Sequence, residues 1–131
     1  MSLLIDTNIA IHVRDGDAAV LARYSALASP PAISVVTLVE LAGGLLTGKV
    51  EERRRRALLL EALLESWAIV DFNGKMAEVY QTVVASTGFS RPRVLDRMIA
   101  ATAIATGMPL ATINTRDFLA IPGLQIEDWS N

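Results

Sequence analysis

The sequence has no cysteine and a single histidine, His12, among its 131 residues. Disulfides, zinc–thiolate sites and thiol nucleophiles are therefore excluded, and one histidine leaves little from which to build a histidine-based metal site. Aromatic residues make up only 5 % of the chain. This low share argues against the base-stacking surfaces on which many RNA-binding modules depend.

Strong charge and long apolar runs are also missing. Twelve lysines and arginines face 14 aspartates and glutamates, so the formal net charge is −2, unlike proteins that hold nucleic acid by bulk electrostatics. The apolar start of the chain ends at Asp6, too early for a signal peptide, and no apolar run approaches the about 18 residues of a membrane span. We expect a soluble, cytoplasmic protein with no membrane partner, folded as a single domain over residues 1–131.

What is present is an alternation of short apolar runs with longer helical patterns. Strands are expected at residues 3–5, 32–36, 68–72, 110–113 and 124–127. Helices are expected from residue 7 onward and at residues 18–28, 37–46, 50–67, 75–86 and 94–106. Such an alternation is typical of an α/β fold in which helices cover both faces of a parallel sheet of four to five strands.

Four of the 14 acidic residues stand where a charge is unexpected. Asp6 and Asp117 follow the first and fourth expected strands, so both belong at the carboxyl edge of the sheet, where ligands bind in such folds. Asp96 heads a helical stripe that is otherwise apolar, and Glu40 interrupts an apolar stretch. A buried carboxylate costs several kcal/mol unless it is paired, protonated or bound to a cation.

Local structure offers an alternative explanation for three of these acids. Asp6 could cap the helix that follows it, and Asp117 could complete a capping arrangement begun by Asn114. Glu40 would face solvent if its helix were rotated about its axis.

For Asp96 the alternative is an ion pair with Arg93 or Arg97. Taken together, however, several carboxylates that converge without matching bases repel one another. A divalent cation resolves such repulsion, and hard oxygen ligands favour Mg²⁺ or Mn²⁺.

The order and spacing of these residues resemble the PIN-domain family, in particular its VapC-type toxins. The resemblance covers nearly the whole chain and is carried by residues 6–8, Glu40, residues 95–100, 114–118 and 123–129. It implies a PIN-like three-layer α/β/α fold and a ribonuclease that depends on Mg²⁺, with Mn²⁺ as a substitute. It also implies a toxin–antitoxin module with a VapB-type antitoxin as partner, a homodimer, and an RNA substrate such as tRNA.

By this resemblance the catalytic set is Asp6, Glu40, Asp96 and Asp117. Asp6, Asp96 and Asp117 would be the metal ligands, although Asn114 could take the last position instead. Glu40 would orient the attacking water, act as general base or hold a second ion.

Polar neighbours of the four acids are candidates for supporting roles. Residues that would hold the carboxylates or bind phosphate, or simply cap helices, are Thr7, Asn8, Asn114 and Thr115. Residues that would contact RNA phosphates, or neutralise the acidic cluster, are Arg93, Arg97 and Arg116. With the four acids set aside, basic residues outnumber acidic ones, so the net charge does not exclude a phosphate substrate.

Three other functions share parts of this pattern. A haloacid-dehalogenase-like phosphotransferase needs a second aspartate two residues after the first, where this chain has Asn8. A receiver domain needs a lysine after a late strand, but the only lysines are Lys49 and Lys75. A PIN-like binding subunit without activity would not need all four acids.

Overall fold

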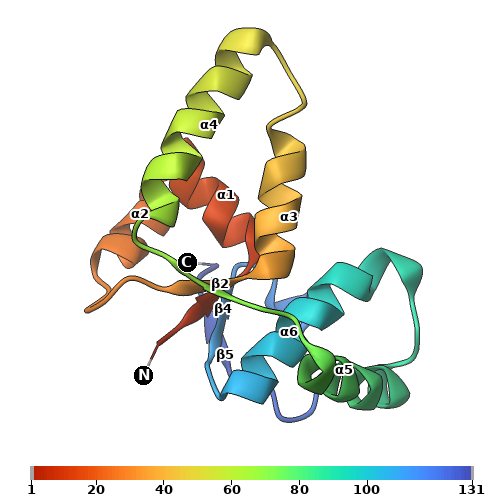
Figure 1. Ribbon diagram of the computed structural model, residues 1–131. Helices are drawn as coiled ribbons and strands as arrows, with labels where there is room; N and C mark the ends of the chain where they lie inside the picture. The colour runs from red at the N-terminus through yellow and green to blue at the C-terminus, as the bar shows by residue number, and fades with distance from the viewer. Residues whose placement is uncertain (1, 131) are drawn as a thin grey trace.

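The computed structural model describes residues 2–130 (Figure 1), so the outermost residues of the expected domain, Met1 and Asn131, lie outside the described residues. Five short strands form one parallel sheet in the order β3-β2-β1-β4-β5. They are β1 (Leu4–Ile5), β2 (Ala32–Ser34), β3 (Ala68–Val70), β4 (Leu110–Thr112) and β5 (Ile126–Asp128). The parallel sheet predicted from the sequence is confirmed.

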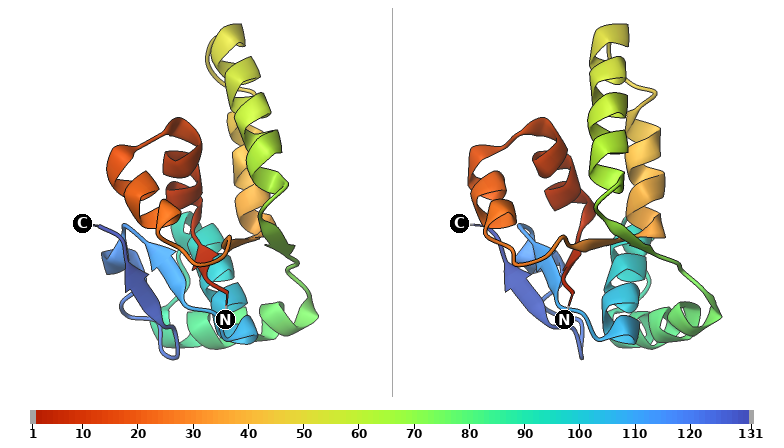
Figure 2. Two further views of the ribbon diagram at one scale, coloured as in Figure 1. Left: turned by 90° about the vertical axis from the view of Figure 1, so that its left-hand side faces the viewer. Right: turned by 60° about the vertical axis from the view of Figure 1, so that its left-hand side comes forward.

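Helices cover both faces of this sheet, which confirms the predicted three-layer α/β/α architecture (Figure 2). One layer contains α1 (Thr7–Asp15), α2 (Ala18–Ser25), α3 (Val35–Gly44) and α4 (Val50–Leu64), and the other contains α5 (Gly74–Thr87) and α6 (Val94–Thr106). Two short 3₁₀ turns, η1 (Arg91–Arg93) and η2 (Thr115–Asp117), precede α6 and follow β4. Within residues 2–130 no helix is long and apolar enough to cross a membrane.

Alternating side chains of the strands supply two separate cores. Leu4 of β1 belongs to the core beneath α5 and α6, with Val83 and Ile99, whereas its neighbour Ile5 packs with Ile9 on the α1 side. All four of the isoleucine and leucine side chains named are fully buried. Because successive side chains of a strand point to opposite faces, even a two-residue strand contributes to both layers.

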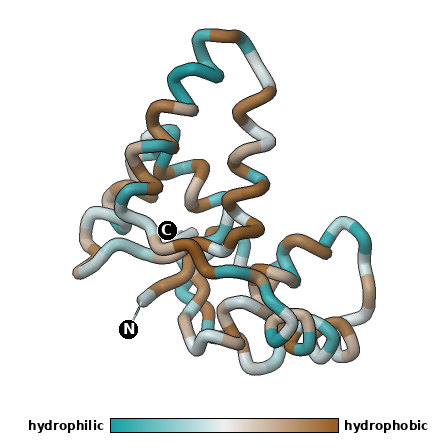
Figure 3. Tube along the Cα trace, viewed as in Figure 1, coloured by the Kyte–Doolittle hydropathy of each residue, from teal (hydrophilic) through white to brown (hydrophobic). Residues whose placement is uncertain are grey.

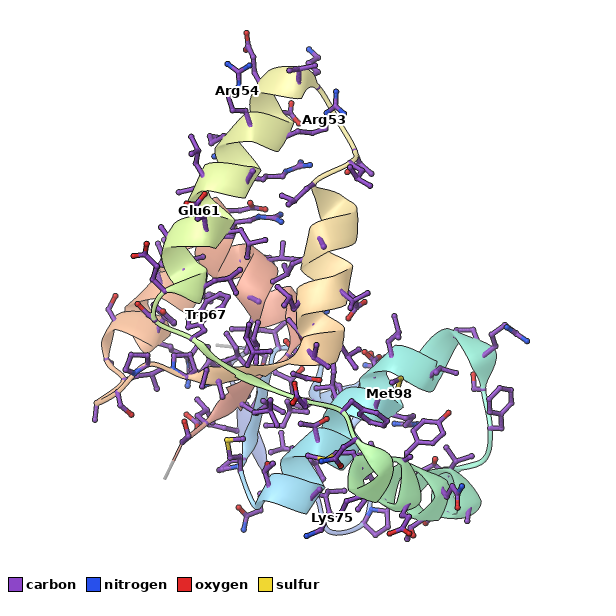
Figure 4. All side chains as sticks on the ribbon, in the orientation of Figure 1. Arg53, Arg54, Glu61, Trp67, Lys75 and Met98 are labelled. Carbon is purple, nitrogen blue, oxygen red and sulfur yellow. The ribbon has the colours of Figure 1, made fainter. Side chains whose placement is uncertain are left out.

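The helices α3 and α4 form an antiparallel pair that rises away from the sheet (Figure 1). Arg56 closes the connection between them, because its Nη1 donates to the main-chain oxygens of Gly44 at 3.3 Å and Thr47 at 3.2 Å. The arginine-rich first half of α4 is hydrophilic (Figure 3), and Arg54 lies near the outer end of the pair (Figure 4). At the inner end, Trp67 donates from Nε1 to the Tyr24 hydroxyl at 2.8 Å and anchors the chain beside α2.

The second strand is shorter than expected, and this difference positions part of the site. The β-branched run was predicted to stay extended through residue 36, but the strand ends at Ser34. The Ser34 hydroxyl accepts a hydrogen bond from the Val36 amide at 3.1 Å and caps α3, as serine commonly does. Since α3 begins at once, its first turns stand directly above the carboxyl end of β2.

Strand order explains why the site forms at the middle of the sheet. β1 lies between β2 and β4, and the chain proceeds outward from β1 in both directions. The carboxyl ends of these three central strands therefore meet at the switch point, where α/β folds bind ligands.

Candidate functional site

Asp6 lies at the carboxyl end of the central strand and is 4 % exposed. Its amide donates to the Ala111 carbonyl of β4 at 3.1 Å, which ties it to the neighbouring strand. Its Oδ1 accepts a hydrogen bond from the Ile9 amide at 2.9 Å and caps α1. The capping role considered as an alternative is therefore real, and it occupies only one of the two carboxylate oxygens.

Burial raises the pKa of Asp6 above its ordinary value, and the charges of Asp96 and Glu40 add to this effect. Hydrogen bonds from the Thr112 hydroxyl and the Ile9 amide stabilise the charged form and oppose the rise. Desolvation and like charges disfavour ionisation, whereas donors favour it. Asp6 is thus a buried acid that forms no ion pair with any base within residues 2–130.

Glu40 lies on α3, where its side chain is half-buried rather than turned fully to solvent. The Thr7 hydroxyl donates to its Oε1 at 2.5 Å, and the hydroxyls of Thr7 and Thr37 are 3.0 Å apart. Because Thr7 gives its only proton to Glu40, the Thr37 hydroxyl must donate to Thr7. This relay engages Oε1 of Glu40, while the charge of Glu40 is near enough to act on Asp6 and Asp96.

Asp96 stands in the first turn of α6 and is half-buried. Burial raises the pKa of Asp96, and the nearby charges of Asp117 and Glu40 raise it further. The positive charges of Arg93 and Arg97 partly offset this rise. Neither arginine forms an ion pair with Asp96 among residues 2–130, so the pairing considered for it is wrong.

The arginines bind Asp117 instead. Arg93 donates from Nη1 to Asp117 Oδ1 at 3.0 Å, and Arg97 donates from Nη1 to the Asp117 main-chain oxygen at 2.8 Å. The side chain of Asp117 is 34 % exposed. Of the two alternatives for Arg93, neutralisation of the acidic cluster is the one that the structure displays.

The remaining candidate residues are half-buried or exposed. The main-chain amide of Asn114 donates to Thr112 Oγ1 at 2.9 Å. The Asn114 side chain does not cap η2. A cavity of about 400 Å³ opens beside it, lined by Ile113, Asn114, Thr115, Arg116 and Asp117. Arg116 and Asn8 are exposed.

Two threonines of the site were missed in the sequence. Thr112 and Thr37 are both fully buried, and their hydroxyls support Asp6 and Glu40 respectively. The available signal was a threonine inside an apolar run, three residues before Glu40 in one case and at the end of a strand in the other. A buried hydroxyl needs a hydrogen-bond partner. Thr112 contacts Asp6 directly, whereas Thr37 contacts the Thr7 hydroxyl, which in turn contacts Glu40.

Comparison with known proteins decides the family. The sequence model of the PIN domain matches residues 3–124. The chain belongs to the PIN-domain family. Two curated VapC relatives match almost end to end: the "tRNA(fMet)-specific endonuclease VapC" of Shigella flexneri is 30 % identical over 99 % of both chains, and the "Ribonuclease VapC" of Rickettsia bellii is 31 % identical over 96 % of this chain and 95 % of its own.

Solved VapC-containing structures share the fold. A VapBC2 complex from Rickettsia felis, bound to a DNA fragment from its promoter, contains a chain with a TM-score of 0.84 at 26 % identity, covering 98 % of this chain and 99 % of that one. A DNA-bound VapBC from Salmonella typhimurium gives 0.83 at 27 % identity over 98 % of both chains. The predicted assignment to the VapC-type PIN ribonucleases is confirmed.

The acidic residues of this PIN domain are suited to hold a Mg²⁺ ion that keeps several of its water ligands. Within residues 2–130 no three histidine, cysteine, aspartate or glutamate side chains are gathered closely enough to hold a metal by themselves. Mg²⁺ retains several waters and is commonly held by one or two carboxylates, with phosphate oxygens completing its shell. Asp6, which is buried and whose pKa is raised by the charge of Asp96, and the half-buried Asp96 meet that requirement, whereas Asp117 is engaged by Arg93.

Proposed function

We propose that this protein is a Mg²⁺-dependent endoribonuclease that hydrolyses phosphodiester bonds of RNA and acts as the toxin of a VapBC-type module. The observation that carries the proposal is the convergence of Asp6, Glu40, Asp96 and Asp117 at the carboxyl edge of a PIN-domain sheet, close enough that neighbouring carboxylates raise the pKa of Asp6 and of Asp96. Structural ion pairs would be balanced by bases. Within residues 2–130 Asp117 is the only one of the four with an ion-pair partner, and a cation that binds there when the protein works explains the three unpaired acids.

In this proposal Asp6 and Asp96 are the principal metal ligands, and Asp117 joins directly or through water. The bound ion would polarise the scissile phosphate and lower the pKa of a water molecule. Mn²⁺ satisfies the same oxygen ligands and should substitute.

Glu40 is suited to orient the attacking water and to receive its proton. The Thr37–Thr7 relay holds Oε1, and the second carboxylate oxygen would be the one to accept the proton. A positioned carboxylate base contributes about a hundredfold or more to such a reaction. Thr112 and the Ile9 amide hold Asp6 in a comparable way.

RNA would approach over the cavity beside η2, where Asn114 and Thr115 can donate to phosphate and Arg116 is open to solvent. Two of the curated relatives are named as specific for tRNA(fMet), so tRNA is the first substrate to test. A cytoplasmic location follows from such a substrate.

The partner proposed is a VapB-type antitoxin, since several solved relatives are named as VapBC complexes. We also propose a homodimer. Val39 on α3 and Leu95 on α6 are 66 % and 43 % exposed, so both apolar side chains are available for burial between two copies of the chain. Light scattering on the purified chain tests the dimer, and co-purification with the antitoxin tests the complex.

Cleavage of bulk tRNA by the purified protein tests the activity. We expect Mg²⁺-dependent cleavage that stops in excess EDTA, returns with Mn²⁺ and is lost in Asp96→Asn. Growth arrest on expression, relieved by the cognate antitoxin, tests the toxin role. Metal binding without cleavage of any cellular RNA would favour a PIN-like binding subunit, and full activity in EDTA would refute the metal mechanism.

A further inference from the structure

Two arginines hold Asp117 in different ways. Arg93 contacts the carboxylate at 3.0 Å, and the two side chains are 43 % and 34 % exposed. Arg97 contacts the main-chain oxygen at 2.8 Å and is only 8 % exposed. The Arg93 contact is at the surface and engages the carboxylate, which a cation would also bind. The Arg97 contact is made by a buried side chain and engages the main-chain oxygen, which the cation does not need.

The buried arginine is an anchor. Its Nη1 contact joins α6 to the turn η2, while its Nε has no hydrogen-bond partner among residues 2–130. A guanidinium stays charged in proteins, and a buried one that loses its partner is left uncompensated at a high cost. The hydrogen bond to the Asp117 main-chain oxygen is therefore expected to persist whether or not a cation binds.

The surface arginine is exchangeable. Arg93 pairs with Asp117 at 3.0 Å where both side chains reach solvent, and its charge also offsets the effect of Asp117 on Asp96. Arg93 thus acts as the cation of the site when no metal is bound. Exposed ion pairs change equilibria by only about two- to fivefold, so a divalent cation can displace this one.

We propose that Arg93 is an exchangeable counter-ion, which neutralises Asp117 in the metal-free protein and turns to an RNA phosphate when a divalent cation takes that carboxylate. The proposal rests on the proposed function, and it assigns the substrate-binding role of Arg93 to one state of the enzyme. Arginine suits both partners, since its planar fork matches carboxylate and phosphate alike. A necessary consequence is that metal and RNA each strengthen the binding of the other by the same factor.

Mn²⁺ binding by the full chain, measured calorimetrically without RNA, tests the first half of the exchange. Arg93→Gln removes the competitor and should tighten Mn²⁺ binding about two- to fivefold. Arg116→Gln is the matched control, because it removes the same charge from η2 but lies at an exposed position without an ion pair among residues 2–130. Equal or weaker Mn²⁺ binding in Arg93→Gln, or equal tightening in the control, would overturn the exchange.

Binding of bulk tRNA in EDTA and in Ca²⁺, with cleavage monitored on gels, tests the second half. The wild type should gain affinity when Ca²⁺ is added, and Arg93→Gln should lose most of that gain. Arg116→Gln should lose affinity equally in both conditions. A full metal-dependent gain in Arg93→Gln contradicts the proposal.

Asp117→Asn supplies a second test that does not depend on Arg93→Gln folding correctly. It frees Arg93 without metal, so tRNA affinity in EDTA should rise, and the rise should shrink when Arg93→Gln is added in the same chain. No rise, or an undiminished rise in the double variant, refutes the exchange. Failure of the wild type to bind Mn²⁺ would instead refute the metal part of the proposed function, so the two failures are distinguishable.

Discussion

Three strands of this sheet end at an aspartate, and their places in the sheet give these residues different properties. Asp6 after the central strand β1 is buried and has a raised pKa, whereas Asp128 at the end of the edge strand β5 is fully exposed and has a lowered pKa because Ser130 donates to it. Asp71 after the other edge strand, β3, is also exposed. An aspartate after a strand therefore marks a site only where neighbouring strands and helices enclose it.

The largest expected effect separates the central acids from those at the edges. Asp6→Asn and Asp96→Asn should lower RNA cleavage by at least about a thousandfold, because each removes a metal ligand. Asparagine is chosen at position 6 because it preserves the cap of α1. Cleavage rates with tRNA at saturating Mg²⁺ measure the loss.

Asp71→Asn and Asp128→Asn are the controls for this contrast and should retain full activity. Each makes the same chemical change directly at the end of a strand. Comparable losses in either edge variant would show that general charge, not enclosure, explains the effect.

Glu40 should rank next. Glu40→Gln keeps the side chain's size and its acceptor for Thr7 but removes the base, so we expect a loss of about a hundredfold in kcat. Thr37→Val, which breaks the relay that orients Glu40, should cost about tenfold. Equal losses in the two variants would mean that Glu40 serves only as a structural acceptor.

The pH dependence of metal binding should follow the raised pKa values of Asp6 and Asp96. Metal binds the ionised carboxylates, so protons compete with it at pH values where ordinary, exposed aspartates are already fully charged. Mn²⁺ affinity should therefore fall as the pH is lowered, and the fall should begin at a higher pH than the ordinary titration range of an exposed aspartate, at about pH 4. Calorimetric titrations above that pH would contradict the assignment if affinity stayed constant.

The smallest expected effect is on the stability of the metal-free protein. Its sign should be opposite for the central Asp96 and for Asp128 at the edge of the sheet. A raised pKa means that the folded state binds protons more tightly than the unfolded state, so stability falls as pH rises through the interval between the two pKa values. Asp96→Asn removes this penalty and should raise the free energy of unfolding at pH 7 by about 1 kcal/mol. Asp128→Asn should lower it slightly, because a lowered pKa reports a favourable charge, and thermal unfolding in EDTA measures both.

The sequence was sufficient for the architecture because the signals are local. Apolar runs of strand length alternate with helices whose ends are marked by Gly16 and Gly107, both in the left-handed conformation. The end of β2 was predicted two residues late, because β-branched residues favour a strand while the Ser34 cap starts a helix. One side-chain hydrogen bond outweighed the propensity of two residues.

The acidic residues of the site could be predicted from the sequence, but the arginines that bind them could not. Asp6 and Asp96 could be found because a charge next to an apolar stripe is costly wherever it lies. That Arg93 and Arg97 contact Asp117 rather than Asp96 depends on how η2 packs against the start of α6. These contacts join residues 24 and 20 positions apart, and no periodicity in the sequence encodes them.

Asp6 starts α1 and faces the other acids with a single side chain. Its Oδ1 receives the Ile9 amide proton, so the first turn of α1 is fastened to the group that would hold the metal. The rate at which the Ile9 amide hydrogen exchanges with solvent therefore reports whether the site is occupied. Loading the protein with a divalent cation should slow exchange at Ile9 while amides at the far end of α1 keep their rates, a signal that can be followed without any substrate.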